Sequence, residues 1–328
     1  MGIDGFRFDL APVLGRTPNA FERTAWDDQR RFFRDHPLLS AIRDLGRAEE
    51  VEMIAEAWDL WGYEVGNFPS DWGEWNGRYR DAVRRFVRGD GNTREFADMM
   101  NGDILHFNDR GGAQHSINFI TAHDGFTLLD LVSYNSKRND QPWPFGPSDG
   151  GTGENLSWDC AGSPEIRRQQ LRNYWTILLL SRGVPMVVAG DELGRTQNGN
   201  NNPWAIDSVG TWTNYHMIAS SSPTLLPTEG AGQYQNNFGT ALGDPLRNPL
   251  FSFTRFVLQL RSSWAQRAPD APRSASAEPF RHLRFSFLRE DGKTPIHDGL
   301  RCVTMCVNDG VGGAHVHQGG ADAVRPSR

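Results

Sequence analysis

Two carboxyl residues, Asp9 and Glu56, each come directly after an apolar-rich stretch, in FRFDLA and MIAEAWD. Arg7 stands two positions before Asp9, so on a strand both side chains project to the same side. Its guanidinium would favour the ionised form of Asp9, which a nucleophile requires. Glu56 leaves an apolar strand close to an ionised Asp9, so its pKa should be raised and it can hold a proton to donate. A nucleophilic and a proton-donating carboxyl are what glycoside hydrolysis with retention needs.

A third carboxylate, Asp124, follows His123 in FITAHDG. It could bind sugar hydroxyls and stabilise an oxocarbenium-like transition state. The alternative is the adjacent His-Asp metal pair of phosphohydrolases, but that pair lies on a helix with further ligands at helical spacing, which are lacking here. Taken alone, Arg7 and Asp9 could form a structural ion pair, and Glu56 could be an acid at a helix N-terminus. Their common position at strand ends favours the catalytic interpretation.

The elements that position these residues alternate between strand and helix, which predicts a parallel sheet with helical crossovers. Helices are expected over residues 37–47, 76–87, 165–181 and 249–261, and the arginines of the second should face away from its apolar side. Strands are expected at 3–10, 51–55, 71–75, 116–122 and 184–190, the last of them buried. In a barrel of parallel strands, active sites form at the C-terminal ends of the strands, where Asp9, Glu56 and Asp124 stand.

Residues 135–160 form a long loop rich in Gly, Pro, Asn and Ser. Loops of this length are usually functional or disordered, and its three large aromatic side chains favour a functional loop. Residues 282–288 predict one strand of a small β region, and the tail beyond Asn308, rich in Gly, Ala and His, is expected to be disordered.

The composition excludes several classes of partner and cofactor. A net charge of −6 and a pI near 5.9 leave no basic surface for nucleic acid or an anionic membrane. The sequence has no run of 18 apolar residues, so no membrane-spanning helix is predicted. VVAGDELG lacks the glycine spacing of a dinucleotide-binding loop. Cys160, Cys302 and Cys306 lack zinc-site spacing and are interpreted as structural thiols, so no metal or cofactor is predicted.

Tryptophan is unusually frequent, with eleven residues, most of them among Gly, Asn and Asp. Any one of them could be a packing residue, since Trp is highly buried on average. As a group they favour platforms on which the apolar face of a pyranose ring could lie. The group comprises Trp58, Trp61, Trp72, Trp75, Trp143, Trp158, Trp204 and Trp212.

At these motifs the sequence resembles the α-amylase superfamily of glycoside hydrolases. GFRFDLA is similar to its nucleophile strand, MIAEAWD to its acid/base strand, and FITAHDG to the strand with the stabilising Asp. Residues 68–81 (FPSDWGEWNGRYRD), WPFGPSDGGTGENLSWDC and AGDELGRTQNGNNN resemble the isoamylase and glycogen-debranching branch. An α-amylase would be expected to have Asn where this chain has Ala122. The resemblance covers about residues 1–260.

The resemblance implies a role for each matched residue. Asp9 would be the nucleophile, Glu56 the general acid/base and Asp124 the transition-state stabiliser. Substrate contacts are implied for Arg7, which orients Asp9, for His123 at the cleavage point, and for Trp58 and Asp59 at the border of the same subsite.

The implied fold is α/β, a partial TIM (β/α)8 barrel of about strands four to eight over residues 1–265. A short, incomplete β region follows over 266–328, where LRSSWAQRAPDAPRSASAEP replaces the His-Pro phrase of the family. The family's Asp-x-x-x-x-Asn-His motif stands on an earlier strand than the nucleophile strand with which this sequence starts. Five strands cannot close a barrel, so we expect the 328-residue chain alone to have little or no activity.

The function expected from the resemblance is hydrolysis of α-1,6 branches of glycogen or amylopectin by double displacement. The alternatives are an α-1,4-acting amylase or a glucanotransferase, which use the same carboxylates, and an inactive remnant that binds glucan. The expected partner is a branched α-glucan, not nucleic acid or a membrane, and nothing in the sequence assigns a compartment or an oligomeric state.

Overall fold

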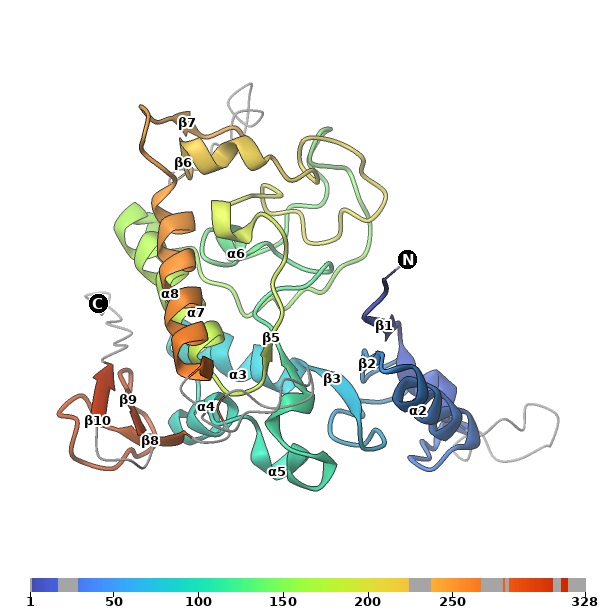
Figure 1. Ribbon diagram of the computed structural model, residues 1–328. Helices are drawn as coiled ribbons and strands as arrows, with labels where there is room; N and C mark the ends of the chain where they lie inside the picture. Colours follow the sequence, from blue (N-terminus) through green and yellow to red (C-terminus); the bar gives the residue numbers. More distant parts are fainter. Residues whose placement is uncertain are drawn as a thin grey trace.

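The computed structural model of the protein describes residues 2–16, 29–223, 237–266, 280, 283–308 and 314–317. Its centre is a five-stranded, all-parallel sheet whose strands stand side by side in sequence order (Figure 1). The strands are β1 (Gly5–Phe8), β2 (Glu52–Ala55), β3 (Trp72–Asn76), β4 (Ser116–Asn118) and β5 (Val184–Pro185). The prediction of an α/β fold with a parallel sheet is confirmed.

Helices follow the strands along the chain. The α-helices are α2 (Pro37–Glu49), α3 (Gly77–Arg88), α4 (Thr93–Met100), α5 (Ile104–Phe107), α6 (Leu128–Leu131), α7 (Pro164–Leu180) and α8 (Pro249–Gln266). Short 3-10 helices cover Ala11–Gly15, Asn108–Arg110, Ala113–His115, Cys160–Gly162, Asp191–Leu193 and Tyr215–Ala219. The four predicted helices are all present, and α8 extends five residues further than expected. None of the described helices is long and apolar enough to cross a membrane.

Helix α3 illustrates how the local sequence sets these elements. The Asn76 side chain accepts a hydrogen bond from the Tyr79 N–H at its start, and Gly89 ends it with a φ of 99°, a conformation that glycine adopts without strain. Its apolar side packs with α4, α7 and α8 into the main core. The prediction that its arginines face away from that side is wrong for Arg84, which is buried and donates to the carbonyl oxygen of Ile120.

Two further strand groups lie outside the parallel sheet (Figure 1). Strands β8 (Arg284–Leu288), β9 (Thr304–Asn308) and β10 (Ala314–His317) form an antiparallel sheet in the order β10-β9-β8, and side chains of this region join the main core. Strands β6 (Ser220–Ser221) and β7 (Thr240–Ala241) form a short pair. The predicted tail beyond Asn308 includes β10, whose backbone pairs with β9; residues 309–313 and 318–328 lie outside the described residues.

The prediction that residues 184–190 form a buried strand is also wrong. Only Val184 and Pro185 pair, and Val184 and Val187 are exposed. Strand β5 stands at one edge of the sheet and β1, with exposed Phe6, at the other. An apolar run signals burial only where another element covers it, and among the described residues nothing pairs with either outer edge.

Candidate active site

Arg7 joins the two predicted catalytic carboxyls. Its Nη1 donates to Asp9 Oδ1 at 2.6 Å and its Nη2 to Glu56 Oε2 at 2.7 Å. The parallel register of β1 and β2 pairs Phe8 with Ala55. The next residues, Asp9 and Glu56, therefore lie side by side at the C-terminal ends of these two strands. Arg7 lies two residues before Asp9 on β1 and points to the same side, as the sequence predicted.

The two carboxyls differ in their surroundings. The Asp9 side chain is 69% exposed and that of Glu56 only 7%. Burial is the main cause that raises the pKa of Glu56 above its ordinary value. The Leu10 N–H, which donates to Glu56 Oε2 at 2.9 Å, and the charge of Arg7 oppose this shift, whereas Asp9 adds to it. The predicted direction of the Glu56 shift is confirmed, and a buried carboxyl with a raised pKa beside an exposed one suits acid and nucleophile roles.

His123 and Arg7 both lie against the ring of Trp75, which connects His123 to this cluster. The Arg7 guanidinium lies over the Trp75 ring, 4.1 Å from its centroid, and the His123 ring lies 5.7 Å from the same ring. Asp124 Oδ2 is 3.6 Å from His123 Nε2. Within the described residues no hydrogen bond or ion pair joins Asp124 to Asp9 or Glu56. The structure thus brings Arg7, Asp9 and Glu56 into direct contact and connects His123 and Asp124 to them through an aromatic ring.

Asp124 lines a cavity of about 550 Å³ between α3 and two loop segments, 151–156 and 201–202. Its side chain is 72% exposed, so its carboxylate is open to a ligand. The long loop at 135–160 is therefore ordered in part as a wall beside a predicted site residue, which supports its interpretation as a functional loop.

Trp58 belongs to an aromatic cluster next to this site. Its ring is stacked on Tyr63 at 5.9 Å and lies 6.5 Å from Trp75 and 6.4 Å from Phe119. Gly77 at the start of α3 allows this packing, because a Cβ there would lie 2.6 Å from the Tyr63 hydroxyl. Tyr63 is about half exposed and Trp58 partly buried, so the pair presents an aromatic edge near the carboxyls.

Asp59 is held in a buried ion pair. Arg16 donates to both of its oxygens, from Nε at 2.6 Å and from Nη2 at 2.7 Å, and the N–H groups of Trp61 and Gly62 donate to Oδ1. Burial alone would raise the pKa of Asp59, but these donors together lower it below its ordinary value. The structure therefore shows Asp59 holding the turn that follows Trp58.

Replacing Arg16 by methionine is expected to lower the free energy of unfolding by about 3 kcal/mol, because it leaves the Asp59 charge buried without its main partner. The two side chains are only 4% and 6% exposed. Urea unfolding of Arg16→Met measures the loss. The double variant Arg16→Met/Asp59→Asn should recover part of it, and equal losses in both would contradict this explanation.

The turn that carries His123 and Asp124 is anchored by the segment after β5. Asp191 accepts from the Thr121 hydroxyl at 2.6 Å and from the Leu128 N–H at 3.0 Å, at the two ends of the turn. The Asn201 carbonyl accepts from the N–H of Gly125 at 3.0 Å in its middle. These bonds set the backbone of a turn whose own side chains are exposed, so Asp191 positions predicted site residues without touching them.

The Asp191→Asn variant is expected to reduce the pH dependence of stability. Burial raises the pKa of Asp191 to about 6, whereas an unfolded Asp titrates near 4. A raised folded pKa contributes stability that is complete below about pH 4 and is lost as the pH rises through about 6. Asparagine stays neutral, so the gain in unfolding free energy from pH 7 to pH 5 should be smaller than in wild type. Urea unfolding at both pH values tests this, and equal gains would contradict it.

The predicted tryptophan group divides by exposure. Trp72 and Trp75 are buried, so neither can present an open ring face, and the platform interpretation is wrong for them. Trp72 packs against Phe8 and Phe68, and Trp75 packs against Ile117 and Phe119. Trp58 and Trp158 are partly buried, and the exposed members are Trp61, Trp143, Trp204 and Trp212.

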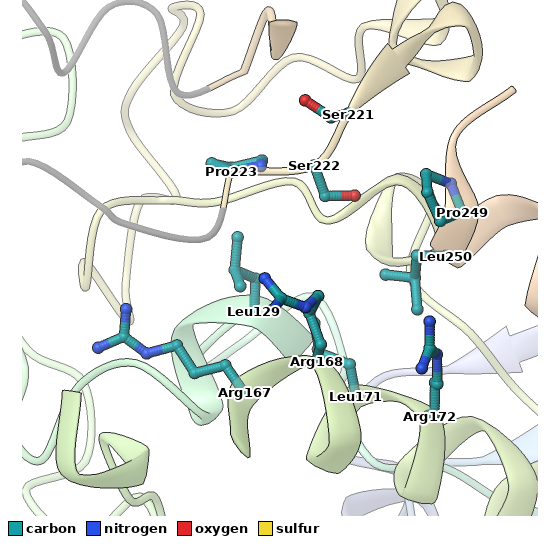
Figure 2. A pocket seen from close by; sticks show the side chains of 10 residues that line it. All are labelled: Leu129, Arg167, Arg168, Leu171, Arg172, Ser221, Ser222, Pro223, Pro249 and Leu250. Carbon is teal, nitrogen blue, oxygen red and sulfur yellow. The ribbon is translucent and has the colours of Figure 1, made fainter. Parts of the chain in front are cut away.

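A second cavity, of about 210 Å³, lies between α7 and the segments at 221–223 and 249–250 (Figure 2). Leu129, Leu171 and Leu250 give it an apolar floor, and the arginines of α7 stand around it. It contains none of the predicted site residues. In the described part of the chain no group of three His, Cys, Asp or Glu side chains could hold a metal ion, and no cysteine forms a disulfide.

Sequence reasoning missed three contributors to the site: Trp75 as the bridge to His123, Tyr63 as the partner of Trp58, and Asp191 as the anchor of the turn. Two gave a usable signal. Trp75 lies near the end of β3, a strand of the same sheet. Asp191 follows the apolar run VPMVVAG directly, the pattern that identified Asp9 and Glu56. Tyr63 gave none, because its stacking depends on the close approach at Gly77.

The chain was compared with known proteins. No protein-family model matches it. It is 43% identical over 224 residues to an isoamylase of a Flavobacterium species. The aligned region covers 65% of this chain and 28% of that protein. It is 42% identical over 242 residues to a glycogen operon protein GlgX homolog of Mycobacterium bovis, covering 69% of this chain and 31% of that one. This chain thus spans less than a third of either relative.

Its fold resembles that of PulA from Klebsiella pneumoniae, solved as a maltotriose complex. The TM-score is 0.55 at 16% identity, over 94% of this chain and 35% of that chain. The structural similarity indicates only the fold, whereas the sequence identity above 40% to an isoamylase and a GlgX homolog indicates the family. The chain belongs to the isoamylase and glycogen-debranching branch of the α-amylase superfamily of glycoside hydrolases.

Proposed function

We propose that this chain carries the catalytic residues of a retaining hydrolase that cleaves α-1,6 branch linkages of glycogen or amylopectin. The observation that supports this most is the single guanidinium of Arg7 bonded to an exposed Asp9 and a buried Glu56 at one edge of a parallel sheet. Relatives named isoamylase and GlgX homolog favour debranching over α-1,4 cleavage or glucan transfer.

In the proposed reaction Glu56 gives its proton to the glycosidic oxygen while Asp9 attacks the anomeric carbon. The carbon–oxygen bond to the leaving chain breaks, and a β-linked glycosyl ester forms on Asp9. Glu56 then takes a proton from water, whose oxygen attacks the anomeric carbon and releases Asp9. The product regains the α configuration. Asp124 would stabilise the positive charge that develops on the sugar in both steps.

The remaining predicted contacts are part of the same proposal. His123 would contact the sugar at the cleavage point, because it stands between Trp75 and Asp124. Arg7 would hold both carboxyls at the distance that the reaction needs. Trp58, with Tyr63, would border the subsite, and Asp59 would border it through the turn it holds.

We further propose that residues 1–265 form about strands four to eight of a TIM barrel and that 266–328 form a short β region. Five parallel strands in sequence order, with predicted site residues at their C-terminal ends, support the first part. The antiparallel strands β8 to β10 support the second. Among the described residues nothing pairs with the outer edges of β1 and β5, and further strands would join there.

The test uses this chain preceded by the Flavobacterium isoamylase sequence that comes before its matched region, and the chain alone beside it. On amylopectin, debranching should increase iodine colour and release reducing ends, with far less release from pullulan than from amylopectin. A fall in iodine colour would indicate α-1,4 cleavage, and chain transfer without new reducing ends would indicate a glucanotransferase. Either outcome would overturn the proposal. The chain alone should show little or no turnover.

A further inference from the structure

The cavity that Asp124 lines shares a wall with the candidate active site. The Phe119 ring lies 5.7 Å from Trp75 and 6.4 Å from Trp58, and the guanidinium of Arg80, which lines the cavity, lies 5.7 Å from the same ring. Phe119 and the turn at 122–125 thus separate the carboxyl cluster of β1 and β2 from the cavity.

The walls of the cavity are built before any ligand arrives. Arg84 is buried and its guanidinium donates to the carbonyl oxygens of Ile120 and Asn155, which ties α3 to the segment after β4 and to the loop at 150–156. Asn201 Nδ2 donates to the Thr152 carbonyl and to Asn155 Oδ1, both at 2.8 Å. These bonds join both loops to the helix, so a ligand meets a formed site and little ordering entropy opposes binding.

The charges around the cavity cancel. Three arginines, Arg80, Arg84 and Arg85, face three carboxylates, Asp81, Asp124 and Glu154. Arg80 Nε donates to Asp81 Oδ1 at 2.7 Å. An anion would meet the carboxylates and a cation the guanidinium groups. An uncharged ligand with many hydroxyls can instead donate to the carboxylates and accept from the arginines.

We propose that this cavity is a further subsite, which binds glucosyl units of the α-glucan on the far side of Asp124 from the Asp9 and Glu56 cluster. Arg85 and Asp81, on the exposed part of its α3 wall, supply hydrogen bonds to sugar hydroxyls. This inference rests on the proposed function, because Asp124 belongs to both sites. A volume of about 550 Å³ falls within the range of small-molecule sites and exceeds the 210 Å³ of the second cavity.

The test is calorimetric titration of the full chain with maltohexaose. Arg85→Ala and Asp81→Asn should each raise Kd about 5- to 10-fold, the effect of one lost hydrogen bond to a charged group at a partly exposed site. Arg94→Ala is the matched control, because Arg94 is an exposed helical arginine on α4, outside the cavity, and it should leave Kd unchanged. Maltohexaose should also slow hydrogen exchange at 150–156 in wild type. Unchanged melting temperatures would exclude unfolding as the cause.

Three results would overturn the proposal: no binding of maltohexaose by wild type, an unchanged Kd in both cavity variants, or displacement of maltohexaose by inorganic phosphate. Failure here is distinguishable from failure of the proposed function. If the cavity variants bind maltohexaose as wild type does, while Asp9→Asn abolishes debranching in the enzyme completed with isoamylase sequence, only the cavity subsite is lost.

Discussion

The Asp9→Asn variant of the completed enzyme is expected to lose at least about 10³-fold in kcat on amylopectin while it still binds glucan. Asn is nearly isosteric with Asp and can keep a hydrogen bond with Arg7, so the site should stay assembled. It cannot, however, form the glycosyl ester. Initial rates of reducing-end release measure the loss, and titration with maltohexaose measures the binding.

The matched control is Asp4→Asn, an exposed carboxyl just before the same strand. Its rate should equal that of wild type. A reactive fluorinated glycosyl substrate should leave a covalent adduct on Asp9, detectable by mass spectrometry, in wild type only. A kcat for Asp9→Asn within tenfold of wild type would exclude Asp9 as the nucleophile.

The Glu56→Gln variant is expected to lose about 10²- to 10⁴-fold in kcat, the usual contribution of general acid–base catalysis. The loss should be large for amylopectin, whose leaving group needs a proton, and smaller for a glycosyl fluoride, whose leaving group does not. Because Glu56 must be protonated in the first step, kcat/KM of the wild type should fall as the pH rises through its raised pKa. The glycosyl fluoride should show a weaker fall on this alkaline side.

Arg7→Met gives an independent check on this assignment. The charge of Arg7 lowers the pKa of Glu56, so removing it should raise that pKa. The alkaline limb of the pH profile, which is the fall of kcat/KM with rising pH, should then move to higher pH. A structural role alone would lower the rate without moving the limb. If the limb stays in place, another group supplies the proton.

Much of the fold follows from local sequence patterns. Apolar alternation identified β1, short apolar-rich stretches located β2 to β4, and the spacing of apolar residues with Asn76 at its start located α3 within one residue. Asp9 and Glu56 were found because each directly follows such a strand, and parallel strands place their C-terminal ends at one edge. These features depend on neighbours in the chain, which a sequence displays directly.

Burial and long-range contact were decided only by the tertiary structure. VPMVVAG has the composition of a buried strand, yet it stands at an edge of the sheet, where no described element covers it. Arg84 is predicted from the sequence to be a surface residue, but its guanidinium is buried and donates to carbonyl oxygens of two distant segments. Asp59 follows Trp58 in the chain and is predicted to border the same subsite, but its carboxylate forms an ion pair with Arg16. In each case the outcome depends on which groups from elsewhere in the chain arrive at that point, and no local pattern encodes this.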